Sequence, residues 1–415
     1  MKYKSQINRS RSILFISALD LWSMGNGKGG PALWRTLTGY TDHGWKVYFI
    51  TGNLNQTNNL NYRPNDNINV FRFNMFWLTR LMKIKKIGFF AKIIWWVWFQ
   101  VVAFIKALQI HRKNNIDVVY GYEIYGVPVA KLLSKIWKIP LISRFQGTIL
   151  GVSWMHKKFW KLRAWQHVLA FKIPTNLIIM TNDGTQGDRV LRQLNINNNR
   201  VKFWMNGVDW EHFKKINSQT IAKKDLKIEA KYVLLNLSRL ASWKCVERSI
   251  NAISGLVNNF YNTQLIIVGD GPERKKLEQL RDKLGIRKNV RFEGAIPHTK
   301  VPEYLSTADI FLSFYDWSNV GNPLLEAMMA GKCIITLNNG DTGRFIKNGY
   351  NGVLLEYKDL PKLSQVIKGL LEDEERRNYL GANARKFAEE HFWSWEERIE
   401  AEIKEVTYLV ERIES

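Results

Sequence analysis

Cysteine and histidine are scarce in this sequence: its 415 residues include two cysteines and seven histidines. The cysteines, Cys245 and Cys333, are too few for a disulfide scaffold or a four-cysteine zinc site. Sparse cysteine suits the cytoplasm, where we expect the protein to be. The sequence has no Asp-x-Asp pair, and no other metal-binding motif stands out. We therefore expect neither a metal nor another cofactor.

Acidic residues are scarce in the first half of the chain only. Residues 1–200 hold 29 Lys and Arg against 7 Asp and Glu, a surplus of +22, whereas residues 201–415 hold 32 against 30, a surplus of +2. A genome whose composition merely favours lysine would raise the lysine content of both halves of the chain. The one-sided positive charge instead indicates a polyanionic partner, either a nucleic acid or an anionic membrane.

The strongest membrane signal lies between residues 75 and 113, but its uncharged run, Ile93–Ile105, is short. As a helix it is about 20 Å long, whereas a bilayer core of about 30 Å needs about 20 residues. On a helical wheel one side combines lysines with aromatic rings, and we expect that side at an anionic bilayer surface. With the cations upstream, the predicted membrane-facing residues are Lys83, Lys85, Lys86, Lys92, Trp95, Trp96, Phe99 and Lys106.

The other side of this helix, around Val97 and Val101, is then expected to pack in the protein core. The alternative is a buried helix whose lysines extend to solvent.

Short apolar runs alternate with helical stretches along the whole chain. One set begins at Ile13–Ser17, and a second begins at Tyr232–Leu237 after a Lys-rich connector. Such alternation indicates parallel sheets covered on both faces by helices. We predict two Rossmann-like, doubly wound α/β domains that face a cleft, with ligands bound in loops after the strands. The predicted boundaries are 1–205, 206–389 and a C-terminal segment, 390–415.

Several loops that follow these strands have residues suited to a phosphorylated ligand. Gly29 and Gly30 follow the first strand, where glycines allow the backbone to approach a phosphate, or simply form a tight turn. Arg239 and Lys244 follow the strand 232–237 and either clamp a diphosphate or are solvated surface charges. Glu326 begins an apolar helix, where an acid either compensates the helix dipole or binds a ribose diol.

Together these residues resemble the retaining glycosyltransferases of the GT-B fold, glycosyltransferase family 4, over about 330 residues. The second half of the chain has the more specific motifs. They are Asn206-Gly207-Val208-Asp209, Ser238-Arg239-Leu240-x-x-x-Lys244, Gly269-Asp270-Gly271-Pro272, Phe292-x-Gly294 and Leu325-Glu326-Ala327-Met328-x-Ala330-Gly331. The last resembles the second half of the family's E-x7-E motif. The resemblance also implies that the C-terminal helix crosses back to the first domain.

The sequence departs from the family pattern at three positions. The first acid of E-x7-E falls at Ser318, and the catalytic histidine that often follows a first-domain strand appears as Gln146. Cys245 replaces the glycine that usually follows the clamp lysine. Glutamine can hydrogen-bond a sugar hydroxyl but is not a base near neutral pH. The identity of the groups that replace the glutamate and the histidine stays open.

The resemblance implies transfer of a sugar from a nucleoside diphosphate sugar with retention of configuration and without a metal. Arg239 and Lys244 would stabilise the departing diphosphate, and Gln146 and Glu123 would orient the acceptor. The residues expected at the donor are Gly29, Gly30, Arg239, Lys244, Gly271, Gly294, Ser318, Asn322, Leu325 and Glu326.

We expect a lipid-linked or glycan acceptor in surface polysaccharide assembly, because the acceptor-side domain is the basic, aromatic one. The protein would then be peripherally attached to the inner face of a bacterial cell membrane. A first alternative is a catalytically inactive partner of GT-B shape. A second is a nucleic-acid-binding protein, although no recognition motif for nucleic acid supports it.

Overall fold

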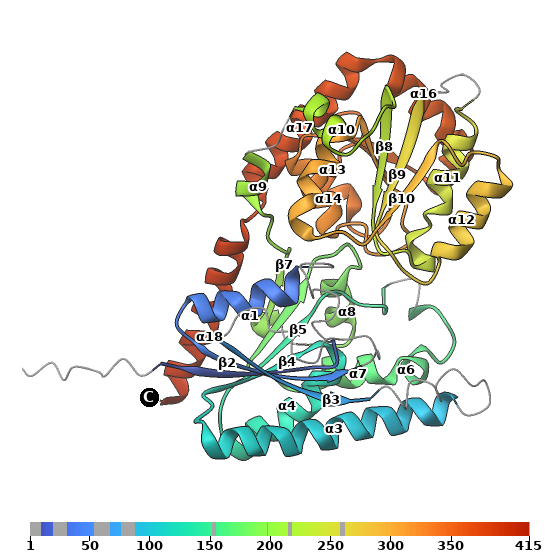
Figure 1. Ribbon diagram of the computed structural model, residues 1–415. Coiled ribbons are helices and arrows are strands. Elements are labelled where there is room, and N and C mark those ends of the chain that lie inside the picture. Colours follow the sequence, from blue (N-terminus) through green and yellow to red (C-terminus); the bar gives the residue numbers. More distant parts are fainter. Residues whose placement is uncertain are drawn as a thin grey trace, which may run out of the picture.

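The computed structural model describes residues 10–19, 31–53, 67–75, 88–151, 155–196, 198–214, 218–257 and 262–414 (Figure 1). Two α/β domains lie one above the other. The predictions for Gly29, Gly30, Lys83, Lys85 and Lys86 fall outside the described residues.

The first domain is built on a parallel sheet of seven strands in the order β3-β2-β1-β4-β5-β6-β7. Its inner strands are apolar runs buried on both faces, as a covered parallel sheet requires. The strands are β1 (Ser12–Ser17), β2 (Lys46–Asn53), β3 (Ile68–Asn74), β4 (Val118–Tyr122), β5 (Leu141–Phe145), β6 (Leu177–Thr181) and β7 (Val201–Trp204). The order reverses between β1 and β4, which opens a crevice at their carboxyl ends.

Helices cover both faces of this first sheet. One face packs against α1 (Ala32–Asp42) and α18 (Trp395–Glu414). The other packs against α3 (Gly88–Lys113) and α4 (Glu123–Trp137). Shorter helices near the carboxyl edge are α6 (Trp160–Arg163), α7 (Trp165–Lys172) and α8 (Gly187–Gln193).

The second domain repeats this architecture with six parallel strands in the order β10-β9-β8-β11-β12-β13. The strands are β8 (Tyr232–Leu237), β9 (Thr263–Val268), β10 (Val290–Gly294), β11 (Ile310–Ser313), β12 (Cys333–Leu337) and β13 (Val353–Leu355). The helices α11 (Glu247–Ser254), α12 (Arg274–Lys283) and α16 (Leu363–Glu372) cover one face. The helices α13 (Val301–Thr307), α14 (Asn322–Met329) and α17 (Glu374–His391) cover the other.

The connector between the sheets contains two short helices, α9 (Trp210–Lys214) and α10 (Gln219–Asp225). The two doubly wound sheets confirm the fold class predicted from the sequence.

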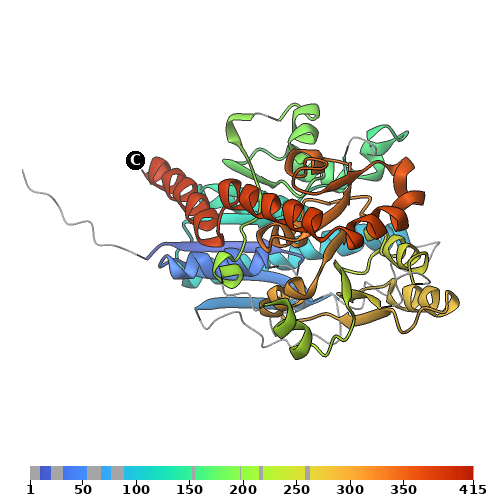
Figure 2. The same ribbon diagram turned by 90° about the horizontal axis from the view of Figure 1, so that it is seen from above.

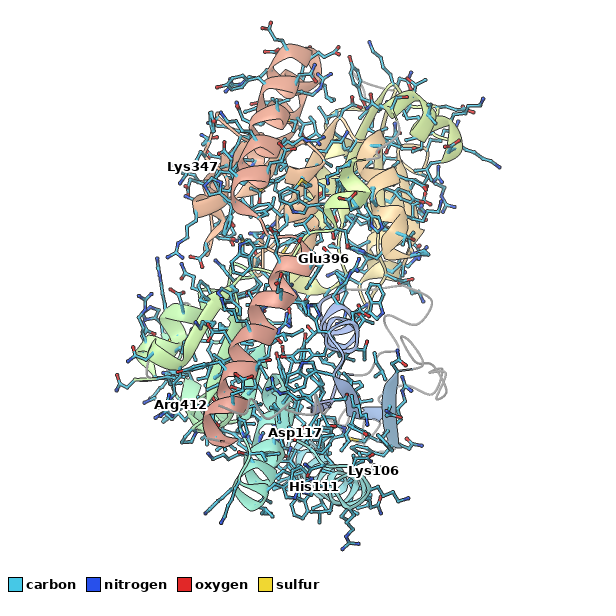
Figure 3. All side chains as sticks on the ribbon, turned by 90° about the vertical axis from the view of Figure 1, so that its left-hand side faces the viewer. Lys106, His111, Asp117, Lys347, Glu396 and Arg412 are labelled. Atoms are coloured by element: carbon cyan, nitrogen blue, oxygen red, sulfur yellow. The ribbon has the colours of Figure 1, made fainter. Side chains whose placement is uncertain are left out.

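The C-terminal helix returns from the second domain to the first, as predicted. Seen from above, α17 and α18 follow one another across the molecule (Figure 2). Figure 3 shows α18, labelled at Glu396 and Arg412, running along the first domain. Its apolar side packs on the first sheet through Trp395, Ile399, Ile403, Val406 and Val410. The chain is therefore fastened to its first domain by its last helix.

A fully buried ionic cluster lies beneath this helix. Glu402 of α18 pairs with Arg144 of β5 at 3.2 Å and with Arg398, one helical turn away, at 3.0 Å. Tyr120 of β4 donates a hydrogen bond to the same carboxylate at 2.7 Å. Arg398 also donates to the main-chain oxygen of Met205, where the first domain ends, at 3.1 Å. Each of the three charged side chains thus has an ionic partner within the core, and the two arginines share the single carboxylate.

The side of helix α3 that was predicted to face a membrane lies in the protein core. Trp95 and Phe99 are 5% and 0% exposed and pack against β1 and β2. Ile94, Val97 and Val101 are 46–55% exposed. The predictions that Trp95 and Phe99 face a membrane and that the side around Val97 and Val101 lies in the core are therefore wrong.

The reason for this inversion is that a helical wheel separates two sides but does not show which side the sheet covers. The side with the large rings also has Ala103 and Ala107, whose small side chains let the helix approach the sheet closely. Of the other predicted membrane residues, Trp96 is half-buried with its ring 5.3 Å from Trp165, Lys92 is exposed and Lys106 is partly exposed.

We predict that Glu402→Ala lowers the free energy of unfolding by about 3–5 kcal/mol, because it leaves two buried arginines without their carboxylate. Urea denaturation followed by circular dichroism measures this loss. The matched control is Glu405→Ala on the same helix, whose partner Lys202 is half-exposed, with an expected loss below about 1 kcal/mol. Equal losses in the two variants would show that the buried cluster does not stabilise the fold.

Candidate active site

The carboxyl-terminal edges of the two sheets meet, and the candidate site lies where they do. Asn206, in the crossing between the domains, donates to Asn322 of α14 at 2.9 Å and to Gln146 after β5 at 3.3 Å. The loop after β6 contacts the loop after β11, where Val320 N donates to the main-chain oxygen of Asp183 at 3.0 Å. The predicted residues Gln146, Asn322 and Ser318 are thus brought to one junction.

The cations Arg239 and Lys244 follow β8 at this edge of the second sheet. Arg239 is exposed, and its side chain makes no hydrogen bond or ion pair with any of the residues that the structure describes. Lys244 ends a short 3-10 helix, Ser242–Lys244. Its ammonium donates to the main-chain oxygen of Ser318 at 3.3 Å and lies 4.0 Å from the ring centroid of Tyr315. Arg239 is therefore open to solvent, whereas Lys244 is partly buried beside the loop that contains Ser318.

The environment of Lys244 disfavours its positive charge. Burial lowers the pKa of this ammonium to about 8, against a smaller opposing effect of the Asp183 carboxylate. A bound diphosphate would supply two or more negative charges beside it. An anionic ligand would therefore stabilise the positive charge of Lys244 by more than it would stabilise the charge of a solvated lysine.

The predicted glycines of the second domain shape the loops next to these cations. At Gly271 a Cβ would lie 2.3 Å from the main-chain oxygen of Leu240, so no larger residue fits against the Arg239–Leu240 loop. Gly294 ends β10 and is buried. Their contact with a donor stays a prediction.

Glu326 lies in α14 and is only 3% exposed. Its carboxylate lies 2.7 Å from His298 Nε2, and His298 Nδ1 lies 3.4 Å from the Asp209 carboxylate, which in turn pairs with Arg35 of α1. Burial lowers the pKa of His298, but Glu326 and then Asp209 outweigh it, so that the pKa is raised. The imidazole of His298 lies between two carboxylates, which favour its charged form, and it links Glu326 through Asp209 to Arg35 of the first domain.

Sequence reasoning missed His298, although it follows β10 at the same edge as the other loops. Leu325 was also expected at the donor. Its side chain is 1% exposed and packs in the core between α14 and the sheet. A donor contact at Leu325 stays a prediction.

The first domain contributes two predicted residues that lie together. Glu123 begins α4 with a φ of 62°, a backbone conformation that is costly outside glycine. It accepts a hydrogen bond from the main-chain N–H of Gln146 at 2.6 Å, and the Gln146 side chain donates to Tyr122 at 2.7 Å. Burial and, to a smaller extent, the neighbouring Asp183 raise the pKa of Glu123 to about 7, against the lowering effects of the Gln146 N–H and Arg144. An acid with this pKa can hold or accept a proton near neutral pH.

No group of three His, Cys, Asp or Glu in a metal-binding arrangement occurs among the described residues. Whether the reaction is independent of a metal stays a prediction.

Two doubly wound domains whose carboxyl edges meet, with a helix that returns to the first, define the GT-B class. The structure resembles HepE of Anabaena in complex with UDP and glucose, at a TM-score of 0.69 and 20% identity, over 94% of this chain and 99% of the other. It also resembles WaaG, a glycosyltransferase involved in lipopolysaccharide biosynthesis, at a TM-score of 0.69 and 20% identity, over 93% and 98% of the chains.

Residues 217–387, which form most of the second domain, match the family Glycosyl transferases group 1. The N-acetyl-alpha-D-glucosaminyl L-malate synthase of Bacillus anthracis is 26% identical over 74% of this chain and 78% of its own length. A GDP-mannose-dependent phosphatidylinositol monomannoside mannosyltransferase of Mycolicibacterium smegmatis is 27% identical over 40% and 45%. The chain spans only 39% and 54% of the length of two further curated relatives. The family resemblance is thus confirmed at the level of group 1 and GT-B, and family 4 stays a prediction.

We predict that binding of a nucleoside diphosphate takes up a proton at Lys244 above about pH 8, because the ligand raises a pKa that is about 8 in the free protein. Affinity should then fall by up to about tenfold from pH 8 to pH 9, as titration calorimetry measures. Lys244→Arg is the control, since its guanidinium stays charged and its affinity should not vary over this range. A pH-independent affinity in the wild type would contradict the prediction.

Proposed function

We propose that the protein transfers a sugar from a nucleoside diphosphate sugar to an acceptor on a membrane surface, with retention of configuration. The observation that carries this proposal is the position of Arg239 and Lys244. They lie at the carboxyl edge of the second sheet, and Asp183 of the first domain lies opposite Lys244. A donor diphosphate bound to these cations would place its sugar between the domains.

The mechanism that this geometry supports needs no general base from the protein. The bond between the anomeric carbon and the β-phosphate oxygen breaks as the acceptor oxygen attacks on the same face. The acceptor proton passes to the departing phosphate oxygen. Arg239 and Lys244 stabilise the negative charge that develops there, a preorganised electrostatic effect that is strong in a cleft with little water. The absence of a histidine at Gln146 is compatible with this route.

Gln146 and Glu123 are proposed to orient the acceptor. Their side chains lie at the ends of neighbouring strands and are fixed by hydrogen bonds, Gln146 to Tyr122 and Glu123 to the Gln146 N–H. An amide and a carboxyl group with a pKa of about 7 suit the hydroxyls of a saccharide.

The proposed membrane contact uses the apolar face of α3, which consists of Ile94, Val97, Val101 and Ile105. These side chains are 46–55% exposed, although they lie on a single face of one helix. Figure 3 marks Lys106 and His111 of α3 at the end of the first domain remote from the second. Phe90–Lys113 is long and apolar enough to cross a bilayer. We propose that it lies in the surface instead, because its opposite face fills the core.

Exposed apolar and basic side chains on neighbouring elements support this orientation. The apolar ones are Leu132, Ile136, Phe159, Leu162 and Leu169. The basic ones are Lys135, Lys157, Lys158, Lys161, Arg163 and Lys172. Each cation near an anionic surface contributes about 1 kcal/mol. A lipid-linked acceptor agrees with the phosphatidylinositol and lipopolysaccharide roles in the names of two similar proteins.

We predict that Arg239→Ala and Lys244→Ala each lower donor turnover by about 10²–10³, because each removes a charge that stabilises the leaving diphosphate. The assay is release of nucleoside diphosphate from UDP-, GDP- and ADP-sugars with a bacterial membrane extract as acceptor. Lys276→Ala, an exposed lysine of the same domain, is the control and should keep full turnover. Near-normal activity in both site variants would refute the proposed clamp. No turnover by the wild type would favour the inactive partner.

We predict that Val97→Glu with Val101→Glu abolishes flotation with liposomes that contain anionic lipid, because two charges enter the proposed apolar face of α3. Tyr379→Glu, at an equally exposed aromatic residue of the second domain, should float like the wild type. Flotation that survives the double substitution, or binding to nucleic acid in place of vesicles, would contradict the membrane orientation.

A further inference from the structure

The loop after β6 joins the first domain to two loops of the second. The main-chain oxygen of Asp183 accepts from Val320 N at 3.0 Å, and that of Gly184 accepts from Asp341 N at 3.3 Å. Gln186 donates through its side chain to the main-chain oxygen of Gly340 at 3.1 Å. Three hydrogen bonds thus hold this loop against the second domain.

The Asp183 carboxylate lies within this junction. One of its oxygens accepts from the main chain and the hydroxyl of Thr185, at 3.1 and 2.6 Å. On the side of β5 the carboxylate lies against Gly147, where a Cβ would be 2.3 Å from its second oxygen. The absence of a side chain at Gly147 therefore leaves the space that this carboxylate occupies.

Two groups of the second domain stabilise the charge of Asp183. Burial raises the pKa of its carboxyl group, and hydrogen bonds from Thr185 and Ser318 and the charge of Lys244 oppose this. Ser318 has a φ of 57°, so its backbone is in a left-handed conformation at the point of contact. An acid of one domain is thus held beside the hydroxyl and the cation of the other.

We propose that Asp183 is a donor-sugar-binding residue, whose carboxylate accepts hydrogen bonds from hydroxyl groups of the sugar being transferred. The inference rests on the proposed function, in which Lys244 binds the diphosphate. The sugar is bonded directly to that diphosphate, so its ring must lie close to Lys244, where the charge of the Asp183 carboxylate acts on the ammonium. An ionised carboxylate can accept from two neighbouring hydroxyls at once.

The charges explain why an acid at this position is compatible with an anionic donor. Without a ligand, Asp183 and Lys244 compensate each other across the cleft. When the diphosphate binds, Lys244 pairs with it. The Asp183 carboxylate then loses Lys244 as its ionic partner and accepts hydrogen bonds from the sugar hydroxyls instead. A nucleoside diphosphate without a sugar gains nothing from Asp183 and is repelled by it. Asp183 would therefore select the sugar-bearing donor over the product.

The test is Asp183→Asn, with affinities measured by calorimetry for a nucleoside diphosphate and its hexose conjugate. The probes are UDP, GDP or ADP, whichever shifts the melting temperature of the wild type most, and the corresponding hexose conjugates. We expect equal or tighter binding of the diphosphate, about tenfold weaker binding of the conjugate, and lower turnover. Asp188→Asn, which removes an acid paired with Arg192 on α8, is the control and should change neither affinity.

A second variant separates this role from a structural one. The double variant Asp183→Asn with Ser318→Asp moves the carboxylate from position 183 to position 318, on the other side of the same contact. Aspartate tolerates the left-handed backbone of position 318. Partial recovery of conjugate affinity is expected. If Asp183→Asn binds the diphosphate and the conjugate equally more weakly, and the double variant restores neither affinity, the inference is overturned but the proposed function is not. No nucleotide binding by the wild type would instead overturn the proposed function and, with it, this inference.

Discussion

The arrangement of the two domains depends on the buried carboxylate of Glu402. It lies on the last helix, yet it pairs with Arg144 of the first sheet and with Arg398, which holds the main chain of Met205 at the crossing between the domains. Charges removed from water must find partners, so this helix has one favourable position on the first sheet. Because α18 follows α17 of the second domain, that position also fixes where the second domain lies.

This fixed arrangement shifts the pKa values of the ionisable groups between the two domains. The carboxyl edges of both sheets meet there, and water is partly excluded, so that Lys244 loses part of its affinity for a proton and Glu123 and Asp183 hold theirs more strongly. Shifts in opposite directions for acids and a base prepare the site for an anionic donor on one side and for hydroxyl groups on the other.

Prediction from sequence succeeded where the pattern is local. Alternating apolar runs gave the two parallel sheets, and spacing within single loops placed Arg239, Lys244 and Glu326 at strand ends or helix starts. It failed where the outcome depends on a distant partner. His298 gains its role from Glu326 and Asp209, and Asp183 from Lys244 and Ser318. On α3, the burial of Trp95 was decided by the sheet that lies beneath it.

The sequence by itself determined the class of fold, the strand-end cations and the concentration of positive charge in the first 200 residues, since these follow from composition and from short periods along the chain. The tertiary structure alone decided which side of α3 is exposed, and that side is apolar rather than basic and aromatic. It also placed Asp183 of the first domain opposite Lys244 of the second. A contact across two domains has no period in the sequence, because it depends on how both sheets and the last helix pack together.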